Sequence, residues 1–312
     1  RYTVLEYIAS GGMQDVYRAH DVLTDQAVAL KTPQAGQGTR RFKQSAQLSS
    51  RVNHFNVAKT TDYFEENGKQ YLIEELVSGC TLEAATLDRL DCVDPHLGAH
   101  VFLRLAKGVA ASHAAGVAHR DIKPGNILVS GGDSFADIKI TDFGIATLAD
   151  GLFDEVVRNG GDLTRSTSGT IQGALPYMAP EMMFRRPGDS VGLEADIWAL
   201  GAVMFRLLTG DYPFGQAMMV PVNVNAGARG PWPAFMTANA QFSPLASSLQ
   251  AIVESCLTIA IGQRPTAPAL VASLEALCFY FAPRHLGTVF ERTGNRGKLT
   301  RQGGGTVFFH TD

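Results

Sequence analysis

"AHRDIKPGNILV", residues 118–129, is the most informative stretch of this sequence, and "ITDFGIA" follows it at residues 140–146. In chain order, the two stretches supply the carboxylate of Asp121, the amide of Asn126 and the carboxylate of Asp142. A magnesium ion bound to a nucleotide needs hard oxygen ligands of this kind. These three side chains are therefore candidate ligands of such an ion.

Further motifs surround these two stretches. "VALK" ends upstream at Lys31, and "YMAPE" at residues 177–181 and "DIWALG" at residues 196–201 follow downstream. Together the motifs resemble the protein kinase family over residues 1–282. "DIKPGN" is the Ser/Thr form of the loop, and "SGGMQDVYRAHD" is similar to bacterial members of the eukaryotic-like, Hanks-type kinases. The resemblance implies an α+β fold with two lobes.

The local patterns agree with two lobes. Up to about residue 80, short segments with β-branched and aromatic residues alternate with turn signals such as Asn67-Gly68, whereas helical periodicity dominates afterwards. We therefore expect a β-rich lobe with one helix at residues 1–77 and a mainly helical lobe at residues 78–282. Residues 283–312 form a basic, glycine-containing extension with short strands. A hairpin docked on the large lobe, a tether and a partner-binding segment are equally compatible with it.

Composition limits the class of protein. A chain of 312 residues with 45% hydrophobic content can bury a substantial core, and a formal net charge of -3 argues against a nucleic-acid partner. The four cysteines form no CxxC pair, which favours a reduced, cytoplasmic setting over a disulfide scaffold. No apolar run approaches the roughly 20 residues of a membrane-spanning helix, so we expect no membrane segment in this chain.

The resemblance implies a role for each central residue. Asp121 matches the catalytic aspartate that accepts the substrate hydroxyl proton, and Lys123 matches the lysine that steadies the transferring phosphoryl group. Asn126 and Asp142 match the residues that hold Mg²⁺, or Mn²⁺, between the phosphates of ATP. Lys31 matches the lysine that contacts the α- and β-phosphates. The catalytic set implied by the resemblance is therefore complete.

The phosphate loop departs from the family pattern. Aligned on Val16, the three glycine positions carry Ala9, Gly11 and Gln14, so only the middle glycine is present. A side chain at residue 14 is expected to hold the loop stiffer or farther from the nucleotide. The nucleotide contacts implied by the resemblance are Ala9, Gly11, Gln14, Val16, Ala29, Lys31, Glu74, Glu75, Val77, Asn126 and Leu128.

The carboxylate that normally holds the phosphate-binding lysine is missing. In the family a glutamate of the following helix holds this lysine, but no acidic residue occurs between Thr32 and Thr61, and the matching position is Ser45 or, shifted by one, Gln44. "YLIEEL" places Glu74 where the family usually has an apolar residue at the back of the nucleotide pocket. Because an unpaired buried ammonium is costly, we expect a Lys31–Glu74 pair. The alternative is that Glu74 faces solvent or pairs with a basic residue of the helix, Arg41 or Arg51.

Other substitutions affect the residues that support the catalytic set. The apolar column that links the lobes would contain His119 and Phe143, but also Thr60 and either Ser49 or, in the shifted alignment, Leu48. Ala174 occupies a position where a hydroxyl residue usually contacts the catalytic aspartate and lysine. Support for the catalytic set is thus reduced.

The segment between Asp142 and Glu181 carries candidate regulatory residues. Arg120 is suited to receive a phosphate from this segment. The candidate phosphorylation sites are Thr164, Ser166, Thr167, Ser168 and Thr170. We also expect Glu181 to pair with Arg264, and Asp196 to brace the catalytic loop.

The sequence predicts a Ser/Thr protein kinase that transfers the γ-phosphoryl group of ATP to protein hydroxyls, including its own by self-association. The alternative is a pseudokinase, a nucleotide-responsive module that acts by binding partner proteins. The complete catalytic set favours the enzyme, whereas the missing glutamate, Gln14, Thr60 and Ala174 favour the module. Phosphorylation of a small molecule is disfavoured because "YMAPE" resembles a platform for peptide substrates.

Overall fold

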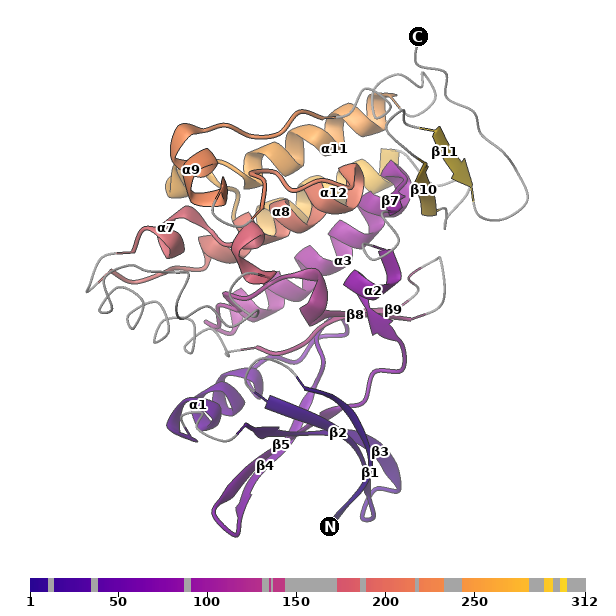
Figure 1. The fold of residues 1–312 in the computed structure, drawn as a ribbon, viewed down its shortest axis with the longest axis vertical. Coiled ribbons are helices and arrows are strands. Elements are labelled where there is room, and N and C mark those ends of the chain that lie inside the picture. The colour runs from indigo at the N-terminus through magenta and orange to yellow at the C-terminus, as the bar shows by residue number, and fades with distance from the viewer. Residues whose placement is uncertain are drawn as a thin grey trace.

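The chain folds into two lobes, one built on a β-sheet and one mainly helical (Figure 1). This computed structural model confirms the α+β two-lobe expectation. The residues that it describes are 1–10, 14–34, 39–86, 91–130, 135, 137–143, 173–185, 189–216, 219–232, 243–280, 289–293 and 298–301.

The small lobe is an antiparallel sheet with the strand order β1-β2-β3-β5-β4. Its strands are β1 (Tyr2–Ser10), β2 (Gln14–Asp21), β3 (Gln26–Pro33), β4 (Thr60–Glu66) and β5 (Lys69–Glu75). Positive φ angles at Asn67 and Gly68 make the tight turn between β4 and β5 that this dipeptide predicts. One face packs Ala19, Val28 and Ile73 into a small core.

Helix α1 (Thr39–Ser49) packs on this sheet through one face. Phe42 and Ala46 are buried against Leu72 of β5. Ser45 and Ser49 are buried on the same side, because residues three and four apart share a helix face. Gln44 is exposed. The structure therefore places Ser45, not Gln44, at the inward position.

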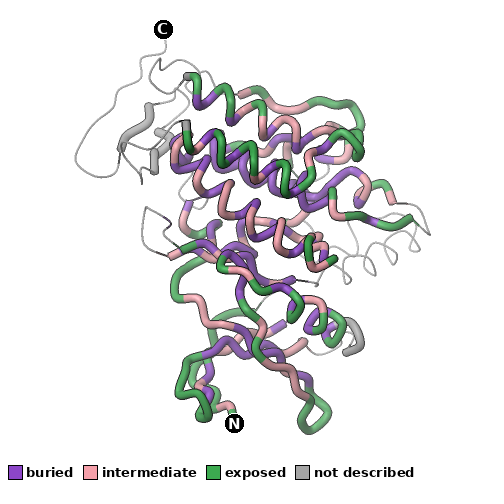
Figure 2. The backbone as a smooth tube through the Cα atoms, turned by 180° about the vertical axis from the view of Figure 1, so that it is seen from behind, coloured by how far each residue is buried: buried purple, intermediate pink, exposed green. Residues whose placement is uncertain are grey.

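The large lobe packs its helices around α8 (Glu194–Thr209), in which almost every residue is buried. Figure 2 shows the buried residues of this lobe in purple and the exposed ones of its outer helices in green. Trp198 and Phe205 of α8 and Phe102 of α3 (Pro95–Ala114) are among the largest buried side chains of the lobe. A Cβ at Gly201 would lie 2.7 Å from Cβ of Cys256, so glycine permits the close approach of α8 and α11. The helices are α2 (Leu82–Thr86), α3 (Pro95–Ala114), α7 (Pro180–Met183), α8 (Glu194–Thr209), α9 (Met219–Ala226), α11 (Ser243–Cys256) and α12 (Ala267–Tyr280), with short 3₁₀ turns at Pro124–Asn126, Leu175–Tyr177 and Ile261–Gln263.

Two small sheets complete the large lobe. One joins β6 (Cys80–Thr81), β8 (Ile127–Ser130) and β9 (Asp137–Ile140). The other joins β7 (Asp91–Val93), β10 (Val289–Thr293) and β11 (Lys298–Arg301), so the C-terminal extension forms a hairpin that pairs with the large lobe (Figure 1). Of the three possibilities for residues 283–312, the described part matches the docked hairpin. None of the helices in the described ranges is both long and apolar enough to cross a membrane.

Candidate active site

Asp196, at the start of α8, holds the loop that carries Asp121. Its two carboxylate oxygens accept the backbone N–H groups of His119 at 2.8 Å and Arg120 at 2.6 Å, as expected from the sequence. Arg120 has a φ of +63°, which is uncommon for a residue other than glycine. The fully buried Asp196 carboxylate therefore fixes a backbone conformation that the loop would otherwise rarely adopt.

The loop brings Asp121, Lys123 and Asn126 together. Lys123 Nζ lies 3.0 Å from Oδ2 of Asp121, and Asn126 Nδ2 donates to the same oxygen at 2.9 Å and to the Asp121 carbonyl at 2.8 Å. The Asn126 side-chain nitrogen is thus committed to Asp121, which leaves its amide oxygen as the group available to a ligand.

The loop is also tied to Asp142. His119 Nε2 lies 2.9 Å from the Thr141 carbonyl, and the Thr141 backbone N–H donates to the Asn126 carbonyl at 3.0 Å. These bonds continue the ladder between β8 and β9, in which Ile127 pairs with Ile140. Asn126 and Asp142 therefore emerge at the same end of that ladder.

Lys31 lies between two carboxylates. Its Nζ donates to Glu74 Oε2 at 2.5 Å, to Asp142 Oδ1 at 2.6 Å and to Thr141 Oγ1 at 3.1 Å. Burial acts to lower the Lys31 pKa, but the opposite charges of Asp142 and Glu74 outweigh it, and the pKa is raised. Burial likewise acts to raise the Asp142 pKa, and the Lys31 charge reverses this, so that pKa is lowered. Lys31 therefore stays charged.

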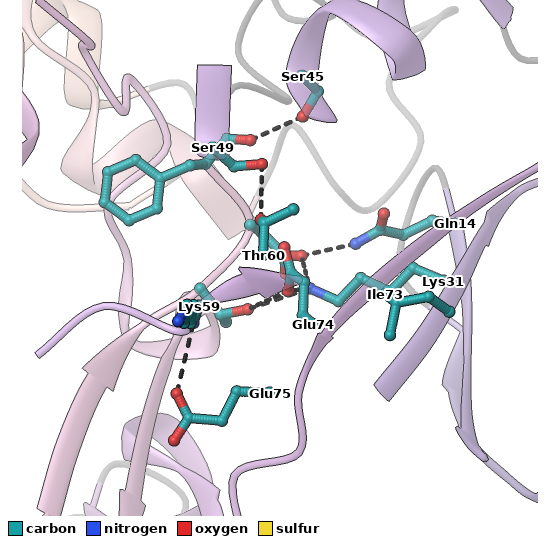
Figure 3. Close-up of polar contacts among 12 residues, drawn as sticks. Gln14, Lys31, Ser45, Ser49, Lys59, Thr60, Ile73, Glu74 and Glu75 are labelled. Atoms are coloured by element: carbon teal, nitrogen blue, oxygen red, sulfur yellow. Dashed lines mark hydrogen bonds and ion pairs between the residues drawn. The ribbon is translucent and has the colours of Figure 1, made fainter. Parts of the chain in front are cut away.

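The partner of Lys31 comes from the neighbouring strand. In the ladder between β3 and β5, Lys31 is opposite Leu72, and Glu74 is two residues farther along the same face (Figure 3). Glu74 is only 3% exposed. The contact expected from the sequence is therefore present, and the alternative in which Glu74 faces solvent is wrong.

Helix α1 contacts the site through hydroxyl groups instead of a carboxylate. Ser45 Oγ donates to the Phe143 carbonyl at 2.7 Å, and Thr60 Oγ1 donates to Ser49 Oγ at 2.9 Å (Figure 3). The Phe143 ring meets the His119 ring edge to face, with centroids 4.5 Å apart. Ser49 thus contacts Thr60, another expected member of the column, whereas Leu48 packs against the core cluster that contains Phe143. Which of the two belongs to the column between the lobes stays a prediction.

Gln14 makes a contact that the sequence analysis did not anticipate. Its side chain is 5% exposed and turns into the site, where Nε2 donates to Asp142 Oδ1 at 2.6 Å. Gln14 therefore connects β2 to Asp142, and its expected effect on the stiffness of the loop and on its distance from a nucleotide stays a prediction. A glycine pattern alone does not indicate this contact, because it considers the missing glycine and not the amide that replaces it.

The remaining expected nucleotide contacts are spread over both lobes. Ala29 is buried and Ala9 is exposed, and Val16 pairs with Lys31 across β2 and β3. The half-buried ones are Val16, Glu75, Val77 and Leu128. Gly11 lies outside the described residues. Contacts of these residues with a nucleotide stay predictions.

Most of the regulatory candidates lie outside the described residues, namely Thr164, Ser166, Thr167, Ser168 and Thr170. Arg120 donates through Nη2 to the Val191 carbonyl at 2.8 Å. Glu181 accepts two hydrogen bonds from Arg264, at 2.6 and 2.8 Å, as predicted. This bidentate pair anchors the "YMAPE" stretch to the large lobe.

Comparisons with known proteins agree with this geometry. The family model for the protein kinase domain matches residues 2–274. The serine/threonine-protein kinase PrkC of Bacillus subtilis is 33% identical over 227 residues, which cover 71% of this chain and 32% of PrkC. PknL of Mycobacterium tuberculosis, also a serine/threonine-protein kinase, is 34% identical over 219 residues, which cover 69% of this chain and 50% of PknL.

These relatives are longer than this chain, which spans about half of PknL and about a third of PrkC. Among solved structures, Rad53 1–466 in complex with AMP-PNP aligns with a TM-score of 0.64 and 20% sequence identity. The alignment covers 86% of this chain and 64% of that chain. At this identity the likeness supports the fold.

Proposed function

This chain belongs to the protein kinase domain family, and from that premise we propose that it transfers the γ-phosphoryl group of ATP to serine and threonine hydroxyls of proteins. The observation that carries the proposal is that Lys123 Nζ and Asn126 Nδ2 lie 3.0 and 2.9 Å from Oδ2 of Asp121, on a loop that Asp196 holds in place. A loop that served only as a scaffold would not need these three polar groups directed at one another.

Each residue of the loop has a distinct part in the proposed reaction. Asp121 accepts the proton of the attacking hydroxyl, so its carboxylate must be both oriented and accessible. Asn126 and Lys123 orient it, and its side chain keeps 21% exposure. Lys123, next to it, lies where its charge stabilises the transferred phosphoryl group.

The donor set of the site suits Mg²⁺. The Asn126 amide oxygen and the Asp142 carboxylate are the hard oxygen ligands that this ion prefers. When bound with ATP, the ion supplies charge neutralisation to the phosphates. Lys31, held charged by Glu74 and Asp142, is the residue that would bind the α- and β-phosphates.

A protein substrate fits the family and the anchored "YMAPE" stretch, and a second copy of the chain is the simplest such substrate. Arg120 and the hydroxyl residues at 164–170 are the proposed elements of control by self-phosphorylation. The nucleotide, the ion and the protein substrate are parts of one proposal and share one test.

The test is incubation of the purified chain with ATP labelled at the γ-phosphate, with Mg²⁺, beside Asp121→Asn. The matched control is Asp25→Asn, the same change at an exposed turn. We expect label on the wild type and the control, and a loss of about 10²-fold or more in Asp121→Asn because the proton acceptor is removed. Equal labelling of wild type and Asp121→Asn, with ATP bound by both, would favour the protein-binding module instead.

A further inference from the structure

The side chain of Gln14 contacts Asp142, and the proposed reaction assigns no role to this contact. Gln14 is the first residue of β2, and its amide extends into the site (Figure 3). Its Nε2 donates to Asp142 Oδ1 at 2.6 Å in surroundings that leave the Gln14 residue 5% exposed. The bond is partly buried, because the Asp142 side chain is 21% exposed, and a hydrogen bond to a charged acceptor is among the stronger ones in proteins.

Gln14 and Lys31 converge on one oxygen atom of Asp142. Lys31 Nζ also donates to Oδ1 at 2.6 Å, so both lone pairs of that oxygen are used. In the part of the chain that the structure describes, Oδ2 accepts no hydrogen bond. One oxygen of the carboxylate is therefore held while the other is available.

The backbone at Asp142 is also in an uncommon conformation. Asp142 has a φ of +64°, and a residue other than glycine keeps such a conformation when the surrounding contacts hold it. Glu74 holds Lys31 but makes no contact with Asp142 itself. Gln14 is thus the second of the two side chains that fix Oδ1.

We propose that Gln14 is a positioning residue for the divalent cation, because it holds Oδ1 of Asp142 and leaves Oδ2 directed to the ion. The proposal rests on the proposed function, which assigns the ion to Asp142. Carboxylates that ligate metals are commonly fixed by outer hydrogen bonds of this kind.

The inference is tested by binding of Mn²⁺, measured by electron paramagnetic resonance in the presence of a non-hydrolysable ATP analogue. Gln14→Met keeps the length of the side chain and removes its donor. We expect it to weaken Mn²⁺ binding about tenfold, the lower end of the effect of outer-shell changes on metal affinity. The matched control, Gln47→Met on the exposed face of α1, should bind as the wild type does.

The outcomes separate this inference from the proposed function. If the wild type binds Mn²⁺ with the analogue and Asp142→Asn does not, the ion site is established independently of Gln14. Unchanged binding by Gln14→Met would then overturn the inference, and tighter binding would overturn it too, because Gln14 would compete with the ion. If the wild type does not bind Mn²⁺, the proposed function itself fails. Thermal melting of Gln14→Met and Gln14→Ala without ion or nucleotide shows whether each variant is folded. Weaker Mn²⁺ binding by a folded Gln14→Ala supports the proposal.

Discussion

Replacing Glu74 by glutamine should destabilise the small lobe although the shape of the side chain is almost unchanged. Removing one partner of a buried ion pair costs about 3–5 kcal/mol when the remaining charge has no other partner. Lys31 keeps Asp142 at 2.6 Å, and the new amide oxygen still accepts a hydrogen bond. We therefore expect Glu74→Gln to cost about 2 kcal/mol, the difference between a charge-assisted and a neutral contact together with partial loss of charge compensation.

The change at Lys31 should cost more, because Lys31→Met leaves both Glu74 and Asp142 without the ammonium group. We expect Lys31→Met to lower the free energy of unfolding by about 4 kcal/mol. The double variant Lys31→Met and Glu74→Gln should also lower the free energy of unfolding by about 4 kcal/mol, because Glu74→Gln removes a carboxylate that has already lost its ammonium partner. The coupling energy is then about 2 kcal/mol, well above the error of additivity for independent sites.

Hydrogen exchange of the β3 and β5 amides, followed by mass spectrometry, reports the free energy of opening of this lobe. The control is Glu75→Gln, the same substitution at the next residue, where the carboxylate is 37% exposed and lies 3.0 Å from Lys139. The Lys139 side chain is 12% exposed, so the pair is only partly exposed, and we expect its contribution at the upper end of the roughly 0–1 kcal/mol of exposed pairs. Additive effects of Lys31→Met and Glu74→Gln, or a silent Glu74→Gln, would refute the reasoning.

Three further predictions concern separate parts of the chain. Ser45→Ala should lower the free energy of unfolding by about 1 kcal/mol in urea denaturation because the Phe143 carbonyl loses its donor, whereas Ser50→Ala on exposed surface should not. The hydrogen bond from Arg1 lowers the pKa of Asp21, so the stability that this contact contributes is present above the unfolded pKa of 3.8 and is lost as the pH falls below that value. Asp21→Asn should therefore make the melting temperature fall less steeply at acid pH. An unchanged dependence of the melting temperature on pH would contradict this. Burial raises the pKa of Cys256 to about 12, so iodoacetamide at pH 8 should modify the exposed Cys80 and leave Cys256 intact in the native protein, as mass spectrometry of peptides would detect.

The sequence predicted most accurately what depends on short spacing or on a missing residue type. The loop around Asp121 and its bracing by Asp196 follow from motifs whose members are close in the chain or fixed by the family pattern. The Lys31–Glu74 pair followed from the lack of acidic residues up to Thr61 and from a carboxylate in a segment that the fold buries.

Other features depended on geometry that the sequence does not encode locally. The Gln14 side chain is directed to Asp142, which lies 128 residues farther along the chain, and a glycine pattern says nothing about such a distant partner. The choice between Ser45 and Gln44 required the rotation of α1, which the packing of Phe42 against Leu72 determines. Pairing of the C-terminal hairpin with β7 joins segments far apart in the chain.

That last pairing has a consequence for how the chain is made. During synthesis from the N-terminus, β7 emerges with the beginning of the large lobe, and β10 emerges only after α12. Until then the edge of β7 that later pairs with β10 has free backbone donors and acceptors, and such edges promote association between chains. A chain ended at residue 282 would keep that edge uncovered permanently, so shortening the protein to its kinase-like part should increase its tendency to aggregate.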